Sequence, residues 1–64
     1  MKIVVGVPAY NEEENIAKII LKLKKIADEV IVCDDGSKDL TGPISKEMGA
    51  ILIQHKKNQG YGGA

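Results

Sequence analysis

The sequence contains no arginine, no tryptophan and no phenylalanine, and it has a single cysteine, Cys33. Without arginine the chain cannot bind a phosphate or carboxylate through a planar, bidentate guanidinium group. Its only aromatic residues are two tyrosines, too few for the base-stacking platform of a single-strand nucleic-acid-binding protein. A lone cysteine cannot form an internal disulfide, and this favours a reduced, cytoplasmic setting.

The chain also lacks an excess of charge of either sign, because nine lysines balance nine acidic residues. No strong field therefore attracts nucleic acid or a membrane surface. The apolar run before Pro8 is too short for a signal peptide or a membrane span. With 64 residues the chain forms one small domain at most, whose single core rarely supplies more than about 3–5 kcal/mol.

What the sequence does contain is an alternation of apolar runs and helical patterns. Strands are predicted over residues 3–7, 30–34 and 50–53, and a helix over residues 12–26. A second helix carries Leu40, Ile44 and Met48 at four-residue spacing and ends at Gly49. This β-α-β-α-β order predicts an α/β, Rossmann-like fold with three parallel strands in the order 3-2-1, joined by right-handed crossovers. Apolar strands without alternation also predict that both faces of the sheet are covered.

Local signals give the expected ends of these elements. Pro8 is expected to end the first strand, because it has no N–H for the ladder. Asn11 and Glu14 have the spacing of a capping box at the start of the first helix. Pro43 is expected in the first turn of the second helix, where its missing N–H costs nothing.

Polar residues follow the first two predicted strands. Because the carboxyl ends of parallel strands share one edge, the loop after Pro8 and the segment Asp34-Asp35-Gly36-Ser37 should lie side by side. Gly36 allows a sharp turn there. An ionised carboxylate only accepts hydrogen bonds, so Asp35 would suit a ligand edge that presents N–H donors. The alternative is a solvated Asp–Gly turn that binds nothing.

These segments resemble the nucleotide-sugar site of family-2 glycosyltransferases of the GT-A type, and the polyprenol-phosphate sugar transferases in particular. The matching runs are Val-Pro-Ala-Tyr-Asn-Glu at residues 7–12, Asp-Asp-Gly-Ser at 34–37 with Asp39 and Thr41, and the glycine-rich residues 58–64. The family's domain is several times longer, and its Asp-x-Asp metal motif is absent here. The resemblance therefore implies that residues 1–64 are the amino-terminal portion of a nucleotide-sugar-binding domain.

The resemblance also implies a set of roles. The donor would be a UDP- or GDP-sugar, and the acceptor of the complete enzyme a polyprenyl phosphate at the cytoplasmic face of a membrane. The complete enzyme would use Mg²⁺ or Mn²⁺, whose ligands lie outside this chain, as do the catalytic residues. No nucleic-acid partner is implied. The residues that would form the base and ribose pocket are Pro8, Tyr10, Glu12, Cys33, Asp34, Asp35 and Gly36.

Two other interpretations remain open at this point. A phospho-receiver domain could use Asp34 and Asp35 as its acidic pocket, but receivers place their paired acids after the first strand and the phosphorylated aspartate after the third. The chain could also be a structural α/β fragment without a ligand. Cys33 is interpreted as a buried strand thiol and His55 as a solvated strand exit. Open edges of a three-stranded sheet predict self-association through residues 3–7, or marginal stability if the chain is monomeric.

Overall fold

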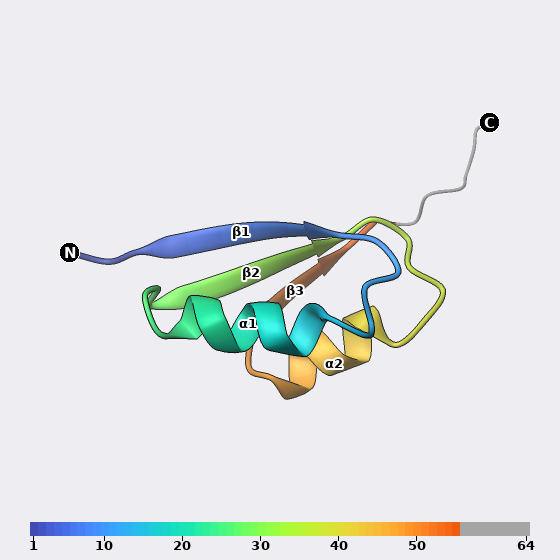
Figure 1. Ribbon diagram of the computed structural model, residues 1–64. Helices are drawn as coiled ribbons and strands as arrows, with labels where there is room; N and C mark the ends of the chain where they lie inside the picture. Colours follow the sequence, from blue (N-terminus) through green and yellow to red (C-terminus); the bar gives the residue numbers. More distant parts are fainter. Residues whose placement is uncertain (56–64) are drawn as a thin grey trace.

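Strands and helices alternate along the chain in the computed structural model, which describes residues 1–55 (Figure 1). The elements are β1 (Val4–Ala9), α1 (Ile16–Lys24), β2 (Glu29–Asp34), α2 (Thr41–Glu47) and β3 (Ile51–Gln54). The three strands are parallel and lie in the order β1-β2-β3. The predicted α/β class and strand order, with the second strand in the centre, are confirmed.

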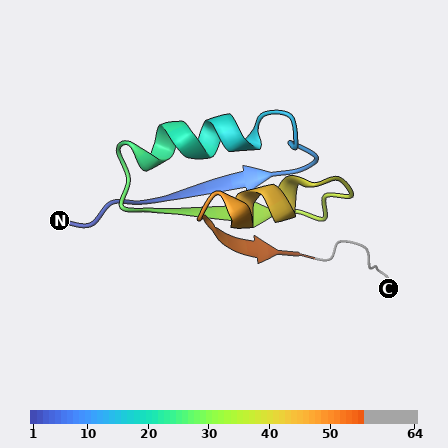
Figure 2. The same cartoon turned by 90° about the horizontal axis from the view of Figure 1, so that it is seen from below.

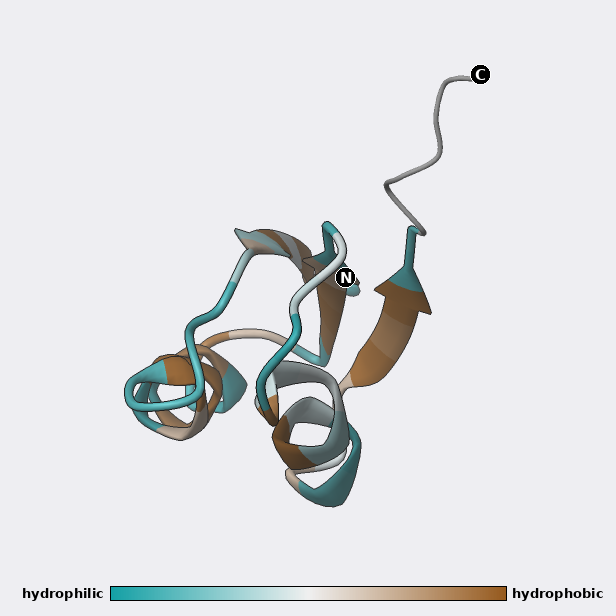
Figure 3. Cartoon of the chain, turned by 90° about the vertical axis from the view of Figure 1, so that its right-hand side faces the viewer, coloured by the Kyte–Doolittle hydropathy of each residue, from teal (hydrophilic) through white to brown (hydrophobic). Residues whose placement is uncertain are grey.

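Both helices pack on the same face of this sheet, so that the sheet forms one layer and the helices the other (Figure 3). Each right-handed crossover adds the next strand on the same side of the previous one, and both connections therefore pass over one face. The prediction that both faces are covered is wrong for the described residues. Val4, Ile51 and Ile53, on the strands that flank β2, are 44–49% exposed.

The apolar core lies between the sheet and the helices. Ile16 and Ile20 of α1 and Val32 of β2 are fully buried, with 0% of their surface exposed. The predicted first helix is shorter at both ends than residues 12–26, and Ile26 lies past the end of α1 and is 67% exposed. Further apolar residues pack around this centre, namely Val7, Ala9, Leu23, Ala27, Val30, Ile44, Met48, Ala50 and Leu52.

Helix α2 packs on the sheet through small residues. Thr41, Gly42 and Ser45 are its buried residues, whereas Leu40, predicted to share a buried face with Ile44 and Met48, is 59% exposed. Small residues are favoured on this face because the helix lies close to the sheet: a Cβ atom on Gly42 would be 2.8 Å from Gln54 Nε2 and 3.3 Å from Asp34 Oδ2. The Ser45 hydroxyl remains satisfied in this apolar setting, because it donates to the Thr41 carbonyl (2.7 Å).

The ends of α2 are as predicted. Pro43 lies in its first turn, and Gly49, with φ of 88°, follows its last turn. Lys24 Nζ donates to the Met48 carbonyl (2.9 Å) and so joins the end of α1 to the end of α2. Neither helix within residues 1–55 has the length or the apolar content needed to span a lipid bilayer.

Strand β1 continues through Pro8 to Ala9, so the prediction that Pro8 ends the strand is wrong. The carbonyls of Ile3 and Ala9 accept hydrogen bonds from Glu29 N–H (3.2 Å) and Asp35 N–H (2.9 Å). The backbone N–H and C=O groups of successive strand residues point alternately to the two edges of the strand. Because Ala9 faces β2, the nitrogen of Pro8 points to the other edge. No described strand lies on that side, and the missing N–H therefore costs no ladder bond.

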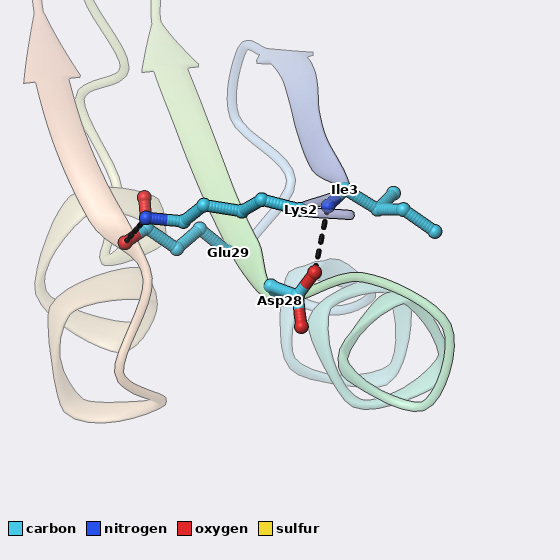
Figure 4. Close-up of polar contacts among 4 residues, drawn as sticks. All are labelled: Lys2, Ile3, Asp28 and Glu29. Carbon is cyan, nitrogen blue, oxygen red and sulfur yellow. Dashed lines mark hydrogen bonds and ion pairs between the residues drawn. The ribbon is translucent and has the colours of Figure 1, made fainter.

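The opposite end of the β1–β2 pair is held by a short group of polar contacts, shown in Figure 4. The Ile3 N–H donates to Asp28 Oδ2 (2.6 Å), and the Ile3 carbonyl accepts from Asp28 N–H (2.7 Å). Lys2 and Glu29 form an exposed ion pair at 3.2 Å, which contributes little to stability. The Asp28–Ile3 hydrogen bonds lie directly before the first pair of the β1–β2 ladder, Val4 and Glu29. They support the register in which Ala9 pairs with Asp34 at the carboxyl end of the ladder.

Candidate functional site

Two loops leave the sheet at its carboxyl edge, one after β1 and one after β2. Both lie at the right-hand end of the molecule in Figure 1 and in the perpendicular view of Figure 2. Ala9 and Asp34 are partners in the strand register, and Asp35 N–H donates to the Ala9 carbonyl (2.9 Å). Tyr10 and Asp35 therefore begin the two loops side by side, as the parallel sheet predicts.

A shallow hollow of about 290 Å³ opens between these loops, lined by Pro8, Ala9, Tyr10, Glu12 and Asp35. Its wall combines two carboxyl groups, an aromatic ring and apolar carbon. Ionised carboxylates accept hydrogen bonds from N–H or O–H groups, and an aromatic ring offers a flat contact surface. The hollow therefore suits a flat ligand with donors at its edge.

Four of the seven predicted nucleotide-binding residues line this hollow: Pro8, Tyr10, Glu12 and Asp35. Ala9 lines it as well and was missed, because an alanine carries no chemical signal in a sequence. Tyr10 is 54% exposed, so its ring is accessible to a ligand.

Asp34 occupies a different environment from its neighbour Asp35. It is only 1% exposed, and its carboxylate accepts from Ser37 N–H (3.0 Å) and from Gln54 Nε2 (3.2 Å). Gly36, with φ of 80°, provides the turn that brings Ser37 back to Asp34. The side chain of Asp34 thus joins the β2–α2 loop to the end of β3, and Asp35 is the carboxylate at the hollow.

Cys33 precedes Asp34 and is a half-buried free thiol. Side chains alternate along β2, with Val32 and Asp34 buried and Cys33 half-buried. Cys33 therefore lies on the sheet face opposite the helices, where its register partner is Pro8. It is not among the residues that line the hollow.

The pKa values of two aspartates in this region are lowered. Burial opposes the ionisation of Asp34, but hydrogen bonds from Ser37 and Gln54 outweigh it and hold its pKa below the ordinary value. Desolvation likewise opposes the ionisation of Asp39, whereas hydrogen bonds from Thr41 and Glu13 lower its pKa. Both carboxylates are therefore stabilised in the charged form by the fold.

These shifts predict how stability depends on pH. A lowered folded-state pKa means that the unfolded chain binds the proton more readily, so the stabilisation is complete above the unfolded pKa of about 3.9. It is lost as the pH falls through the lower folded-state values. We expect the free energy of unfolding, from urea titrations, to decrease between about pH 5 and pH 2. The decrease should be smaller in Asp34→Asn, and a free energy that is constant or rises over this interval would contradict the assignment.

Asn11 does not cap a helix, so the predicted capping box with Glu14 is wrong. Helix α1 begins at Ile16, its cap position is Asn15, and no acidic residue lies in its first turn. Asn11 has φ of 50° and lies in the preceding loop, where its Oδ1 accepts from Lys38 N–H (2.9 Å). The side chain that sequence spacing assigned to the helix instead binds the neighbouring loop.

The described residues do not supply a metal site. Within residues 1–55, no three side chains of histidine, cysteine, aspartate or glutamate gather closely enough to hold an ion. His55 is exposed directly after β3, as predicted. The glycine-rich residues 58–64, which carry the third matching motif, lie outside the described part of the chain.

Comparison with known proteins identifies relatives of this arrangement. The model of the family described as "Glycosyl transferase family 2" matches residues 4–64. An uncharacterised protein of Methanocaldococcus jannaschii is 45% identical over 98% of this chain and 26% of its own length. A UDP-N-acetylglucosamine–dolichyl-phosphate N-acetylglucosaminyltransferase of Methanococcus voltae is 37% identical over 91% of this chain and 30% of its own length.

Solved structures extend the comparison to the fold. Glucosyl-3-phosphoglycerate synthase of Mycobacterium tuberculosis, crystallised with Mn²⁺, UDP and glucosyl-3-phosphoglycerate, matches with a TM-score of 0.75 and 35% identity, over 83% of this chain and 20% of that one. The chain spans 26% of the length of the Methanocaldococcus relative and 30% of the length of the Methanococcus relative.

Proposed function

Since the chain belongs to glycosyl transferase family 2, we propose that it is the amino-terminal, nucleotide-sugar-binding portion of a glycosyltransferase. The observation that carries this proposal is the hollow at the carboxyl edge, whose lining includes Pro8, Tyr10, Glu12 and Asp35. The solved relative bound to UDP supports a nucleotide donor. We take a UDP-sugar as the first candidate and a GDP-sugar as the second.

In this proposal the hollow receives the base and ribose of the donor. The Asp35 carboxylate accepts a hydrogen bond from an N–H group at the edge of the base. Tyr10 and Pro8 provide flat and apolar contact for the ring, and the Glu12 carboxylate accepts from a ribose hydroxyl. Cys33 and Gly36 do not line the hollow, so in this proposal they act through the backbone that positions Asp35, and Asp34 acts through the turn that it stabilises.

The sugar acceptor and the metal belong to the longer protein. We propose a polyprenyl phosphate acceptor, supported by the Methanococcus relative whose name specifies dolichyl phosphate. Structures of the synthase hold Mn²⁺, but the described residues here do not fit a metal, so the proposed role of this chain involves no metal step. The lone cysteine favours a cytoplasmic setting.

We expect the 64-residue chain to bind UDP weakly and without dependence on divalent metal. The described residues offer only base and ribose contacts, which corresponds to a dissociation constant in the millimolar range, about −4 kcal/mol. Titration followed by backbone amide shifts in NMR spectra, with and without Mg²⁺ or Mn²⁺, measures this. Tight, metal-dependent binding of a UDP-sugar would contradict the division of roles proposed here.

The same titration separates the remaining interpretations. Family membership favours a sugar transferase over a phospho-receiver, and a small phosphate donor such as acetyl phosphate provides the direct control. Modification of Asp34 or Asp35 by that donor would favour a receiver. Absence of shifts with UDP, GDP and the phosphate donor would favour a structural fragment.

We also propose that the isolated chain self-associates. β1 is an edge strand of the described sheet. Its first residue, Val4, is 49% exposed, and the preceding residue, Ile3, is 47% exposed. Exposed apolar edges recruit further strands. Sedimentation equilibrium should reveal dimers or larger species at high concentration, and a Val4→Lys variant should shift the distribution toward monomer. A folded monomer across the whole concentration range would refute this proposal.

A further inference from the structure

We infer that Thr41 and Asn11 are positioning residues for the hollow: they hold the β1–α1 loop against the β2–α2 loop, so that Glu12 and Asp35 face one ligand. This inference rests on the proposed function, because it assigns a role in nucleotide binding to residues that do not line the hollow. It concerns residues 11–13 and 37–41, which we call the loop clamp.

Thr41 contributes a hydroxyl group with no exposed surface. Its Oγ1 accepts from Glu12 N–H (2.7 Å) and donates to Asp39 Oδ1 (2.5 Å). The same Asp39 oxygen accepts from Thr41 N–H (2.9 Å). A hydroxyl has one proton to donate. Thr41 donates it in the hydrogen bond to Asp39, so towards the Glu12 N–H its Oγ1 can only accept. The residue held in this way lines the hollow.

Asn11 contributes through its backbone and its side chain. Its N–H donates to Ser37 Oγ (2.7 Å), and its Oδ1 accepts from Lys38 N–H (2.9 Å). Asn11 has φ of 50°, a conformation that asparagine, aspartate and glycine tolerate best. Asn11 lies between Tyr10 and Glu12, so its conformation decides where both of these hollow-lining residues are directed.

The loop clamp contains hydrogen bonds donated in both directions. Besides those of Asn11 and Glu12, the Glu13 N–H donates to Asp39 Oδ2 (3.1 Å) and the Leu40 N–H donates to Glu13 Oε1 (3.0 Å). Each joins residues 26 to 29 positions apart in the sequence, so none of them follows from local structure. A wall that is already ordered loses less entropy when a ligand binds, and that is the function we assign to the loop clamp.

The test compares Thr41→Val with Thr41→Ser in the 64-residue chain. Valine keeps the shape but removes the acceptor for Glu12 N–H, whereas serine keeps the hydroxyl. With UDP as the probe and amide shifts as the readout, we expect Thr41→Val to raise the dissociation constant about three- to tenfold. Thr41→Ser should stay within about twofold of the parent. All titrations are made at a temperature where far-ultraviolet circular dichroism shows each variant folded.

A second pair covers the case in which Thr41→Val does not fold. Asn11→Gly and Asn11→Asp both tolerate a positive φ, but only aspartate keeps an acceptor for Lys38 N–H. Uridine is the probe for this pair, because it has no phosphate charge that an added carboxylate would repel. We expect Asn11→Gly to weaken uridine binding and Asn11→Asp to preserve it. Glu14→Ala, at an exposed position of the same loop, is the control and should bind like the parent.

The outcomes separate this inference from the proposed function. If the parent chain binds neither UDP nor uridine, the proposed function fails, and the inference with it. If the parent binds and the valine and glycine variants bind equally well, only the inference is overturned, whatever their thermal midpoints. Lower midpoints with unchanged dissociation constants would show that the loop clamp stabilises the fold and does not position the site.

Discussion

Asp34→Ala is expected to remove a large part of the stability of the chain. The substitution removes the acceptor for Ser37 N–H and for the Gln54 amide, at a position that is 1% exposed. The half-buried Ser37 N–H would lose a charged acceptor, at a cost of about 1.5–3 kcal/mol, whereas the Gln54 amide belongs to an exposed residue and would turn to water. A single core of this size supplies only about 3–5 kcal/mol, so the chain would lose a large part of its stability. Urea unfolding followed by circular dichroism measures the loss.

The adjacent residue provides a matched control. Asp35→Ala removes the same chemical group one position later, where the side chain is exposed. Exposed substitutions usually change stability by about 0.5 kcal/mol or less. Equal losses in the two variants would mean that burial of Asp34 does not determine its contribution.

Asp35→Asn is expected to have the largest effect on nucleotide binding. Asparagine keeps the size of the side chain but removes its charge and replaces one acceptor oxygen with a donor. It then either faces a base N–H with its own N–H or offers only a neutral acceptor. The expected loss is about 1.5–3 kcal/mol, or roughly tenfold to a hundredfold in the dissociation constant. UDP concentrations that saturate the parent should therefore produce no saturation in this variant.

Two further variants make this result specific. Glu47→Gln removes one negative charge at an exposed position of α2, outside the residues that line the hollow, and should bind UDP like the parent. Asp34→Asn should weaken binding less than Asp35→Asn, provided that it is folded. If Asp34→Asn alone lost affinity, the roles of the two aspartates would be exchanged. If Asp35→Asn bound normally, its proposed role in base recognition would be wrong.

The arrangement of the strands was predictable because it depends on features that a sequence displays directly. Apolar runs separated by helical patterns give β-α-β-α-β, and handedness then leaves few topologies. The polar residues after each strand had to meet at one edge, and Tyr10, Glu12 and Asp35 do line one hollow there. The expectations that succeeded use only chain order and the geometry of parallel sheets.

The errors arose where a residue serves a partner distant in sequence. Asn11 has the local spacing of a cap, but its actual partner is Lys38, 27 positions away. Pro8 is a residue type that usually ends a strand, but its nitrogen points away from β2, which sequence cannot reveal. Thr41 and Ser45 are polar and nevertheless fully buried, because α2 approaches the sheet too closely for larger side chains. In each case tertiary contacts outweighed local preference.

Pairing between strands that are consecutive in the chain also constrains the order in which this fold can form. Val5 pairs with Val30, and Val32 with Leu52, so each ladder closes a loop of similar length at a similar entropic cost. Neither pairing needs a residue beyond Gln54. The β1-α1-β2 unit can therefore form before α2 and β3 dock on it. The two sides of the hollow would then come together in this unit, because Asp35, the last of its lining residues in the chain, directly follows β2.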